Sequence, residues 1–269
     1  MRLSKLVAAT AMLLSAAAWA GPKVWSEPVT GMPFVALSKG CFQMGTKTPV
    51  FTEPELALRH LKFDFNLSAD EQPQHEVCVD AFLIGQYEVR ADDWIKVMGN
   101  SPPEGHSQAP AGGVSWDAAQ EFARRLTQLS AGKHRFRLPT EAEWEYACRA
   151  GQKKVVPYRE NRFDAAEYGM GDNNFVRQPN SVGKRKANAW GLYDMLGNVW
   201  EWVEDGYQSD AYTLHTLYNP KLKEAPSGNR VIRGASHRSE YYRARCGNRG
   251  FYAADGALGQ IGFRLVGTP

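Results

Sequence analysis

The sequence predicts a single loop-rich domain in which short strands and a few helices are joined by many turns. The chain contains 8 Trp, 11 Tyr and 25 Gly residues, and helical periodicity is confined to a few segments. Large aromatic side chains supply buried area without long regular elements, and glycine permits tight turns. The chain shows no internal repeat and no low-complexity linker. One domain over residues 21–269 is therefore the simplest organisation.

Residues 1–20 have the three-part pattern of a cleavable secretory signal peptide. Arg2 and Lys5 open the segment, an apolar run covers residues 6–18, and Ala18-Trp19-Ala20 is a small-x-small cleavage site. A membrane anchor is the alternative, but the run is shorter than the roughly 20 residues that span a bilayer. We therefore expect a periplasmic or secreted protein with no membrane span in the mature chain.

Net charge argues against one class of partner. Cleavage removes two positive charges, so the formal net charge falls from +3 to about +1. A nearly neutral protein has no electrostatic reason to bind nucleic acid non-specifically, and we expect no nucleic-acid partner.

Four cysteines remain in the mature chain, and they are Cys41, Cys78, Cys148 and Cys246. An even number in an exported protein indicates two disulfides, for which the sequence alone allows three pairings. None of the four has the spacing of a zinc site.

Several elements can be assigned along the chain. Strands are predicted at residues 34–44, 77–84 and 261–266 because β-branched and aromatic positions gather there. A short helix is predicted at residues 90–98, with one face as its buried side, formed by Trp94, Ile95, Val97 and Met98. Residues 46–74 are polar and read as an irregular loop.

Two further helices carry start signals. Ser115 is an N-cap residue, and apolar residues follow at helical spacing up to Leu129, before Gly132. Thr140 and Glu143 form a capping box at the start of the next helix. We expect the acidic residues of that helix, namely Glu141, Glu143 and Glu145, to form a solvated, capping face rather than a catalytic site.

Seven sequence blocks together resemble the formylglycine-generating enzyme (sulfatase-modifying factor) family. In order, they are Gly40-Cys41-Phe42-Gln43-Met44-Gly45, Tyr87-Glu88-Val89, Val114-Ser115-Trp116, residues 137–147 (RLPTEAEWEYA), residues 191–202 (GLYDMLGNVWEW), Arg233-Gly234-Ala235-Ser236 and Ile261-Gly262-Phe263-Arg264. The resemblance spans nearly the whole mature chain. It implies a C-type-lectin-like α+β fold with little regular secondary structure. It also implies pairing of Cys148 with Cys246, which leaves Cys41 to pair with Cys78.

The copper chemistry of that family has no counterpart in this chain. Its catalytic members bind copper(I) through two cysteines, and soft thiolates suit that ion. Here the matching run is residues 236–246 (SHRSEYYRARC), with Ser236 and Tyr241 in place of the two cysteines. We therefore expect no copper site and no formylglycine-generating activity by the family mechanism.

The same run is dense in groups that could act on another substrate. The resemblance places the substrate groove here, with His237, Glu240 and Tyr241 as candidate catalytic residues. Candidate substrate-binding residues are Arg233, Ser236, Arg238, Tyr242 and Arg243. The alternatives are a histidine hydrogen-bonded within a turn, and arginines that pair with Asp and Glu residues.

The resemblance also implies a structural calcium site. Its ligands would be the side chains of Asp194 and Glu201 and the carbonyls of Gly197 and Val199, all hard oxygen donors. The alternative is a buried turn in which Glu201 pairs with an arginine. The nearest candidates for a second calcium site are Asp172, Asn173 and Asn174.

Two functions of different classes follow, together with a weaker third. The first is an exported enzyme with altered chemistry that oxidises or matures a peptide-type substrate, such as a siderophore precursor, as some members without the cysteine pair do. The second is a non-catalytic binding module whose face covers residues 233–254, because function belongs to the site rather than the fold. The third is a formylglycine-generating enzyme with relocated ligands. The sequence does not determine an oligomeric state.

Overall fold

Three sheets of short strands form the frame of the domain. The computed structural model describes residues 23–47, 69–152, 178–239 and 243–268. One sheet has the strand order β1-β2-β5-β11-β6, a second has the order β10-β7-β8-β9, and β3 and β4 form a separate hairpin. The strands are β1 (Val24–Ser26), β2 (Pro33–Leu37), β3 (Gly40–Met44), β4 (His75–Val79), β5 (Phe82–Gly85), β6 (Phe136–Arg137), β7 (Trp200–Gly206), β8 (Asn229–Arg233), β9 (Arg249–Ala253), β10 (Ile261–Phe263) and β11 (Val266–Gly267).

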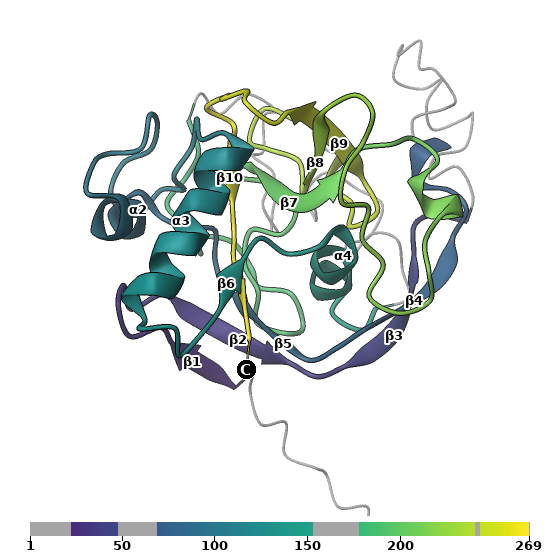
Figure 1. Cartoon of the computed structure of the whole chain (residues 1–269), viewed down its shortest axis with the longest axis horizontal. Helices are drawn as coiled ribbons and strands as arrows, with labels where there is room; N and C mark the ends of the chain where they lie inside the picture. Colours follow the sequence, from purple (N-terminus) through teal and green to yellow (C-terminus); the bar gives the residue numbers. More distant parts are fainter. Residues whose placement is uncertain (1–22, 48–68, 153–177, 240–242, 269) are drawn as a thin grey trace, which may run out of the picture.

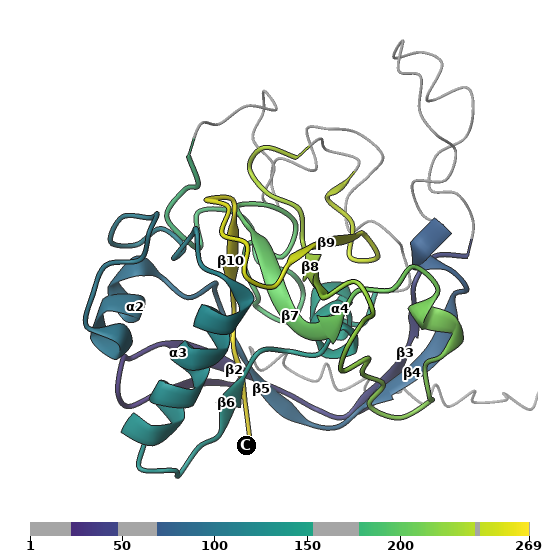
Figure 2. The same cartoon turned by 45° about the horizontal axis from the view of Figure 1, so that its top comes forward.

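Helices pack against these sheets at two places. Helices α2 (Ala91–Met98) and α3 (Trp116–Leu129) lie together on one side of the domain, and α4 (Glu141–Arg149) lies centrally, between the four-stranded sheet and the β3–β4 hairpin (Figure 1, Figure 2). Two short 3₁₀ helices, η1 (Ala69–Glu71) and η2 (Ala211–Thr213), lie beside each other. The predicted α+β architecture with few helices and many short strands is confirmed.

The helix starts follow the sequence signals closely. The Ser115 hydroxyl accepts a hydrogen bond from the Ala118 amide at 3.2 Å, and α3 buries Phe122 and Leu126 on its inner face. Helix α4 begins with a complete capping box between Thr140 and Glu143. In α2, Trp94 is buried as expected, but Ile95 is 43% exposed, so it lies outside the buried stripe.

Strand boundaries were harder to predict than helix starts. Residues 34–44 form two strands, β2 and β3, because the chain leaves the five-stranded sheet at Ser38 and Lys39. Residues 77–84 likewise divide into β4 and β5, and the predicted closing strand divides into β10 and β11. Strand β7 was missed because its residues are buried on both faces, which removes the alternation of apolar and polar positions.

Both disulfides of the domain connect the residues that the family resemblance implied. Cys41 is bonded to Cys78 across the β3–β4 hairpin, and Cys148 at the end of α4 is bonded to Cys246. Every cysteine of the chain is therefore oxidised in this structure. Disulfides are consistent with an exported protein. The described part of the chain holds no helix that could cross a membrane. The predicted signal peptide lies outside the described residues.

Candidate functional site

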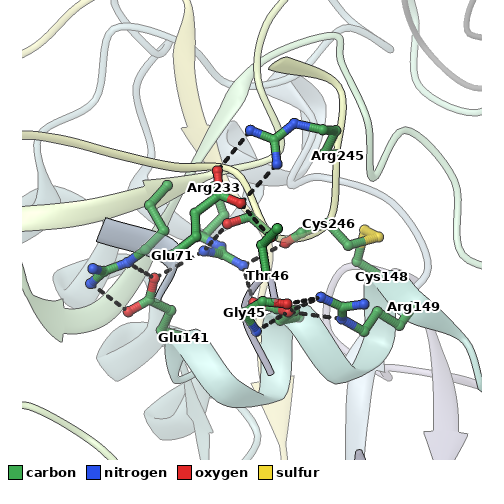
Figure 3. Close-up of polar contacts among 12 residues, drawn as sticks. Gly45, Thr46, Glu71, Glu141, Cys148, Arg149, Arg233, Arg245 and Cys246 are labelled. Carbon is green, nitrogen blue, oxygen red and sulfur yellow. Dashed lines mark hydrogen bonds and ion pairs between the residues drawn. A yellow bond between two sulfur atoms is a disulfide. The ribbon is translucent and has the colours of Figure 1, made fainter. Parts of the chain in front are cut away.

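A buried network of arginines and glutamates lies beside Arg245 and Cys246 (Figure 3). Arg233, at the end of β8, has no exposed surface and pairs with two glutamates of α4. Its Nη1 lies 3.0 Å from Glu141 Oε1, and its Nη2 lies 2.6 Å from Glu145 Oε2. The Arg233 guanidinium also donates to the Cys246 and Gly247 carbonyls. Contrary to the expectation from sequence, Arg233 is unavailable to a substrate here.

Further ion pairs extend this network around α4. Arg249 binds Glu141 through Nε at 2.7 Å, and Arg149 binds Glu145 through Nη2 at 2.6 Å. Burial alone would raise the pKa of Glu141, but Arg249 and Arg233 hold it below its ordinary value. The prediction of a solvated face on α4 is therefore wrong, whereas the predicted capping role of Glu143 is confirmed. Glu141 and Glu145 can be buried because arginines neutralise them, and two of these, Arg233 and Arg249, come from distant segments.

A small cavity lies at the segment that follows β8, where His237 and Arg238 form part of its wall. The cavity has a volume of about 100 Å³. It is lined by Glu104, Pro179, His237, Arg238, Leu258, Gly259 and Gln260. Two of these residues, His237 and Arg238, were predicted from sequence. The opposite charges of Glu104 and Arg238 make the cavity polar, which suits a ligand with both hydrogen-bond donors and acceptors.

His237 is held in one orientation by a single neighbour. The Asn198 carbonyl accepts hydrogen bonds from the His237 amide and from its ring Nδ1, both at 2.8 Å. Since a carbonyl can only accept, Nδ1 carries the proton and Nε2 is the basic nitrogen. Burial, together with Arg238, lowers the pKa of His237 below its ordinary value. His237 is therefore a neutral base at neutral pH, on the wall of the cavity.

Asn198 can face His237 because of its backbone conformation. Its φ is +62°, in the left-handed region that Asn tolerates better than most residues. Its side-chain Oδ1 accepts a hydrogen bond from the Asn180 amide at 2.9 Å, which fixes the turn. Nothing in the sequence near Asn198 indicates this role, although Asn198 lies within the family-like block at residues 191–202.

Ser236 lies behind the cavity wall. It has no exposed surface, and its hydroxyl lies 3.2 Å from the Ser239 hydroxyl and 3.4 Å from Gln260 Oε1. A ligand would therefore meet Gln260 rather than Ser236. Arg243 is half-buried at the start of the last described segment. Glu240, Tyr241 and Tyr242 fall outside the described residues and stay sequence-based predictions.

Glu104 is a cavity residue that no sequence signal indicated. It lies in the loop before α3, and its backbone pairs with Gly112 through two hydrogen bonds of 3.0 Å. Its carboxylate lies so close to the α-carbon of Gly259 that a Cβ there would come within 2.0 Å of Glu104 Oε2. The absence of a side chain at Gly259 thus leaves room for this carboxylate beside His237.

The candidate calcium residues lie in a second buried cluster. The Glu201 carboxylate accepts two hydrogen bonds of 2.7 Å from Arg264 and one of 2.8 Å from Trp144 Nε1. Asp194 Oδ2 accepts from the Gly183 amide at 2.6 Å. Glu88, from the Tyr87-Glu88-Val89 block, is buried beside Asp194, and no hydrogen-bond donor of the described residues reaches either of its carboxylate oxygens.

These carboxyls perturb one another. Burial and the neighbouring charges of Asp194 and Glu201 raise the pKa of Glu88 well above its ordinary value. Burial also raises the pKa of Asp194. Within the described residues, no three His, Cys, Asp or Glu side chains converge in a metal-binding arrangement. A cation here would need backbone carbonyls as well. The candidates Asp172, Asn173 and Asn174 lie outside the described residues.

The fold and the disulfide framework define a sulfatase-modifying-factor-like domain with a polar cavity at its C-terminal segment. The model of the family described as "Sulfatase-modifying factor enzyme 1-like domain" matches residues 23–269, so the chain belongs to that family. Proteins that share a fold can differ in function, so the activity of this chain depends on its site.

Three relatives illustrate the similarity. The chain is 32% identical over 198 residues to the formylglycine-generating enzyme of Mus musculus, covering 64% of this chain and 50% of that protein. It is 33% identical over 197 residues to the enzyme of that name from Streptomyces coelicolor, covering 66% and 59%. The structure of PvdO from Pseudomonas aeruginosa superposes with a TM-score of 0.76 at 25% identity, covering 93% of this chain and 99% of that one. The chain thus spans about half the length of the first of these enzymes.

Proposed function

We propose that this protein is an exported member of its family that oxidises a peptide-type substrate, such as a siderophore precursor, at the His237 cavity without a copper–thiolate centre. The supporting observation is the combination of two features. All four cysteines are held in disulfides, so no thiolate is available to bind copper(I). At the same position along the chain, the oriented neutral imidazole of His237 offers a base to a ligand.

The predicted role of His237 is proton removal. A substrate O–H, N–H or activated C–H group at the cavity would lose its proton to Nε2 of His237. The substrate would then transfer two electrons and a second proton to dioxygen. With the proton that His237 took up, dioxygen would become hydrogen peroxide, so the substrate loses two hydrogens in all. Glu104, Arg238 and Gln260 would orient the polar groups of the substrate. Glu240 and Tyr241 are the other two catalytic residues predicted from sequence. Tyr242 and Arg243 are further substrate-binding residues predicted from sequence.

Substrate conversion tests this proposal directly. The mature protein is incubated in air and under argon with exported peptide precursors, and the products are followed by mass spectrometry. We expect a loss of two hydrogens in air only, and a fall of at least about 100-fold in rate for His237→Ala, the range typical of a general base. His106→Ala, an exposed histidine outside the cavity, is the matched control. Tight binding without conversion would favour the non-catalytic binding module.

We further propose that a structural calcium ion binds at the Asp194–Glu201 turn. With all three carboxyls ionised, Glu88, Asp194 and Glu201 face one guanidinium, that of Arg264, which leaves an uncompensated buried negative charge. A calcium ion would offset that charge through oxygen ligands, with the Gly197 and Val199 carbonyls completing the set. The Glu88 carboxylate, which lies beside Asp194 and which no donor of the described residues reaches, supports the addition of Glu88 to the ligands expected from sequence.

Thermal unfolding in calcium and in a chelator tests the ion separately from catalysis. We expect calcium to raise the unfolding temperature of the wild-type protein, because a ligand that binds only the folded state stabilises it. Asp194→Asn should reduce that rise. An equal rise for the wild type and for Asp194→Asn would show that calcium binds elsewhere, and no rise would contradict the site.

A further inference from the structure

The outer edge of strand β3 is an open backbone edge within a large groove. The groove has a volume of about 590 Å³, a size typical of ligand sites. It is lined by Cys41, Phe42, Gln43, Gln74, Glu76, Tyr146, Arg149, Gly151, Gln152 and Trp190. None of these residues lines the His237 cavity, so the groove is separate from the proposed catalytic site.

The register of the hairpin determines which backbone groups face the groove. Cys41 lies opposite Cys78, but the Cys78 amide donates to Leu217 and its carbonyl accepts from Asn219. Both polar groups of Cys78 therefore point away from β3, which makes the two cysteines a non-hydrogen-bonded pair. The amide and carbonyl of Cys41 consequently point away from β4, toward the free edge. Because the pattern alternates, Gln43 presents its amide and carbonyl to the same edge.

This edge is open only over a short stretch. At Gly45, the amide donates to Glu145 Oε1 at 2.9 Å and the carbonyl accepts from Arg149 Nη2 at 2.8 Å, so α4 closes that end. No backbone hydrogen bond of Cys41 or Gln43 toward the outer side occurs among the described residues. Two donors and two acceptors thus remain open at the spacing of a β-ladder, which suits an added strand.

Side chains beside this edge indicate what kind of strand would fit. Phe42, Tyr146 and Trp190 form an aromatic wall, with ring centroids 5.5 Å apart for Phe42 and Tyr146 and 4.8 Å apart for Tyr146 and Trp190. On the opposite face of the hairpin, Glu76 lies across from Gln43 and is exposed. The other charged lining residue, Arg149, is already paired with Glu145.

We propose that an extended peptide segment of another molecule adds to the free edge of β3 as an antiparallel strand. A large apolar side chain of the peptide lies opposite Phe42 and packs on the aromatic wall. Its neighbours in sequence lie opposite Cys41 and Gln43, on the face that carries Glu76, and one of them is Lys or Arg. The backbone hydrogen bonds provide affinity, and the alternating side chains provide selectivity.

The probe for this proposal is the synthetic peptide acetyl-Thr-Lys-Phe-Lys-Thr-amide, which alternates basic and aromatic side chains. Its matched control carries N-methyl groups on both Lys backbone nitrogens, which are the donors that would face Cys41 and Gln43. We expect saturable binding in isothermal titration calorimetry, weakened at least about tenfold by N-methylation because each methyl removes a backbone hydrogen bond. A peptide with Glu in place of Lys should also bind more weakly.

Two protein variants separate the backbone edge from the side chains. Gln43→Pro removes one outward amide without removing a hydrogen bond to β4, whereas Gln43→Ala keeps that amide. We expect a loss of affinity for the first variant and little change for the second. Trp190→Ala should weaken binding by removing part of the aromatic wall. Circular dichroism of each variant shows whether the fold is intact.

Amide hydrogen exchange decides the remaining question of whether the edge is free. The amides of Cys41 and Gln43 should exchange rapidly in the free protein and slow on addition of the peptide. Protection already present in the free protein would show that this chain covers its own edge, and would overturn the proposal. Absence of binding at millimolar peptide, or equal affinity for the N-methylated peptide, would overturn it as well.

Discussion

Arg264 and Glu201 form a fully buried, bidentate ion pair inside the domain. Arg264 Nε lies 2.7 Å from Glu201 Oε2, Arg264 Nη2 lies 2.7 Å from Glu201 Oε1, and neither side chain has exposed surface. Arg264 also donates to the Gly85 and Tyr193 carbonyls. One side chain therefore connects three segments that are far apart in the sequence.

Arg264→Met should strongly destabilise the protein. The substitution leaves the Glu201 carboxylate buried without its cation and beside two other acidic groups. Loss of one partner of a buried pair costs about 3–5 kcal/mol. The free energy of unfolding from urea denaturation measures the effect.

A double variant distinguishes charge from packing. Arg264→Met combined with Glu201→Gln should recover part of the lost stability, because the buried charge is gone. Arg124→Met, at an exposed pair with Glu121, is the control and should leave the denaturation midpoint almost unchanged. Equal losses for the single and double variants would show that packing rather than charge dominates at Arg264.

The capping box of α4 should contribute measurably to stability. Thr140 Oγ1 accepts from the Glu143 amide at 3.2 Å, and Glu143 Oε2 accepts from the Thr140 amide at 2.8 Å. Thr140→Ala should cost about 1 kcal/mol, within the range of roughly 0.5–2 for such caps. Thr140→Ser keeps the hydroxyl and should cost less. If Ser and Ala are equivalent in urea denaturation, the hydroxyl does not cap the helix.

The two disulfides should differ in their resistance to reduction under native conditions. Cys41 is exposed, whereas Cys148 and Cys246 are 3% and 2% exposed. A reducing thiol must reach a sulfur atom, so we expect Cys41 and Cys78 to be alkylated first. Mass mapping after brief treatment with dithiothreitol and an alkylating agent gives the order. Earlier labelling of Cys148 and Cys246 would contradict the prediction.

A histidine pair should make stability depend on pH. His75 Nδ1 lies 2.8 Å from the Pro73 carbonyl, and its Nε2 lies 3.1 Å from His215 Nδ1. The carbonyl fixes the proton on His75 Nδ1, so His215 Nδ1 donates and the buried Nε2 of His215 has no partner among the described residues. Burial lowers the pKa of His215 to about 4.

The sign of this pH effect follows from proton binding. The unfolded chain binds a proton at His215 near pH 6.5, but the folded protein does so only near pH 4. The contribution is therefore fully present above pH 6.5 and is lost as pH falls toward 4, by at most about 3 kcal/mol. His215→Asn should reduce the pH dependence of the unfolding free energy between pH 4 and 6.5. The exposed control His106→Asn should leave that dependence unchanged. A wild-type slope unchanged by His215→Asn would assign the effect to other groups.

The sequence alone determined the family and the fold class, and the family resemblance implied how the four cysteines pair. These features depend on local patterns or on ordered motifs: the Thr140–Glu143 capping box, the apolar stripe of α3 and seven blocks in the family order. A local pattern can be recognised in the sequence because the interacting residues lie within a few positions of one another. The same holds for the position of His237, which a motif identifies directly.

Only the tertiary structure decided which polar side chains line the cavity and which are buried behind it. Arg233 and Ser236 lie in the motif but are buried, because glutamates of α4 pair with the arginine and Ser239 and Gln260 contact the serine. Glu104 and Asn198 reach His237 from distant loops, with no signal at short range. The open edge of β3 depends on the hairpin register and on the bonds of Cys78. Such contacts join residues far apart in the chain, so their physical cause is packing rather than local sequence.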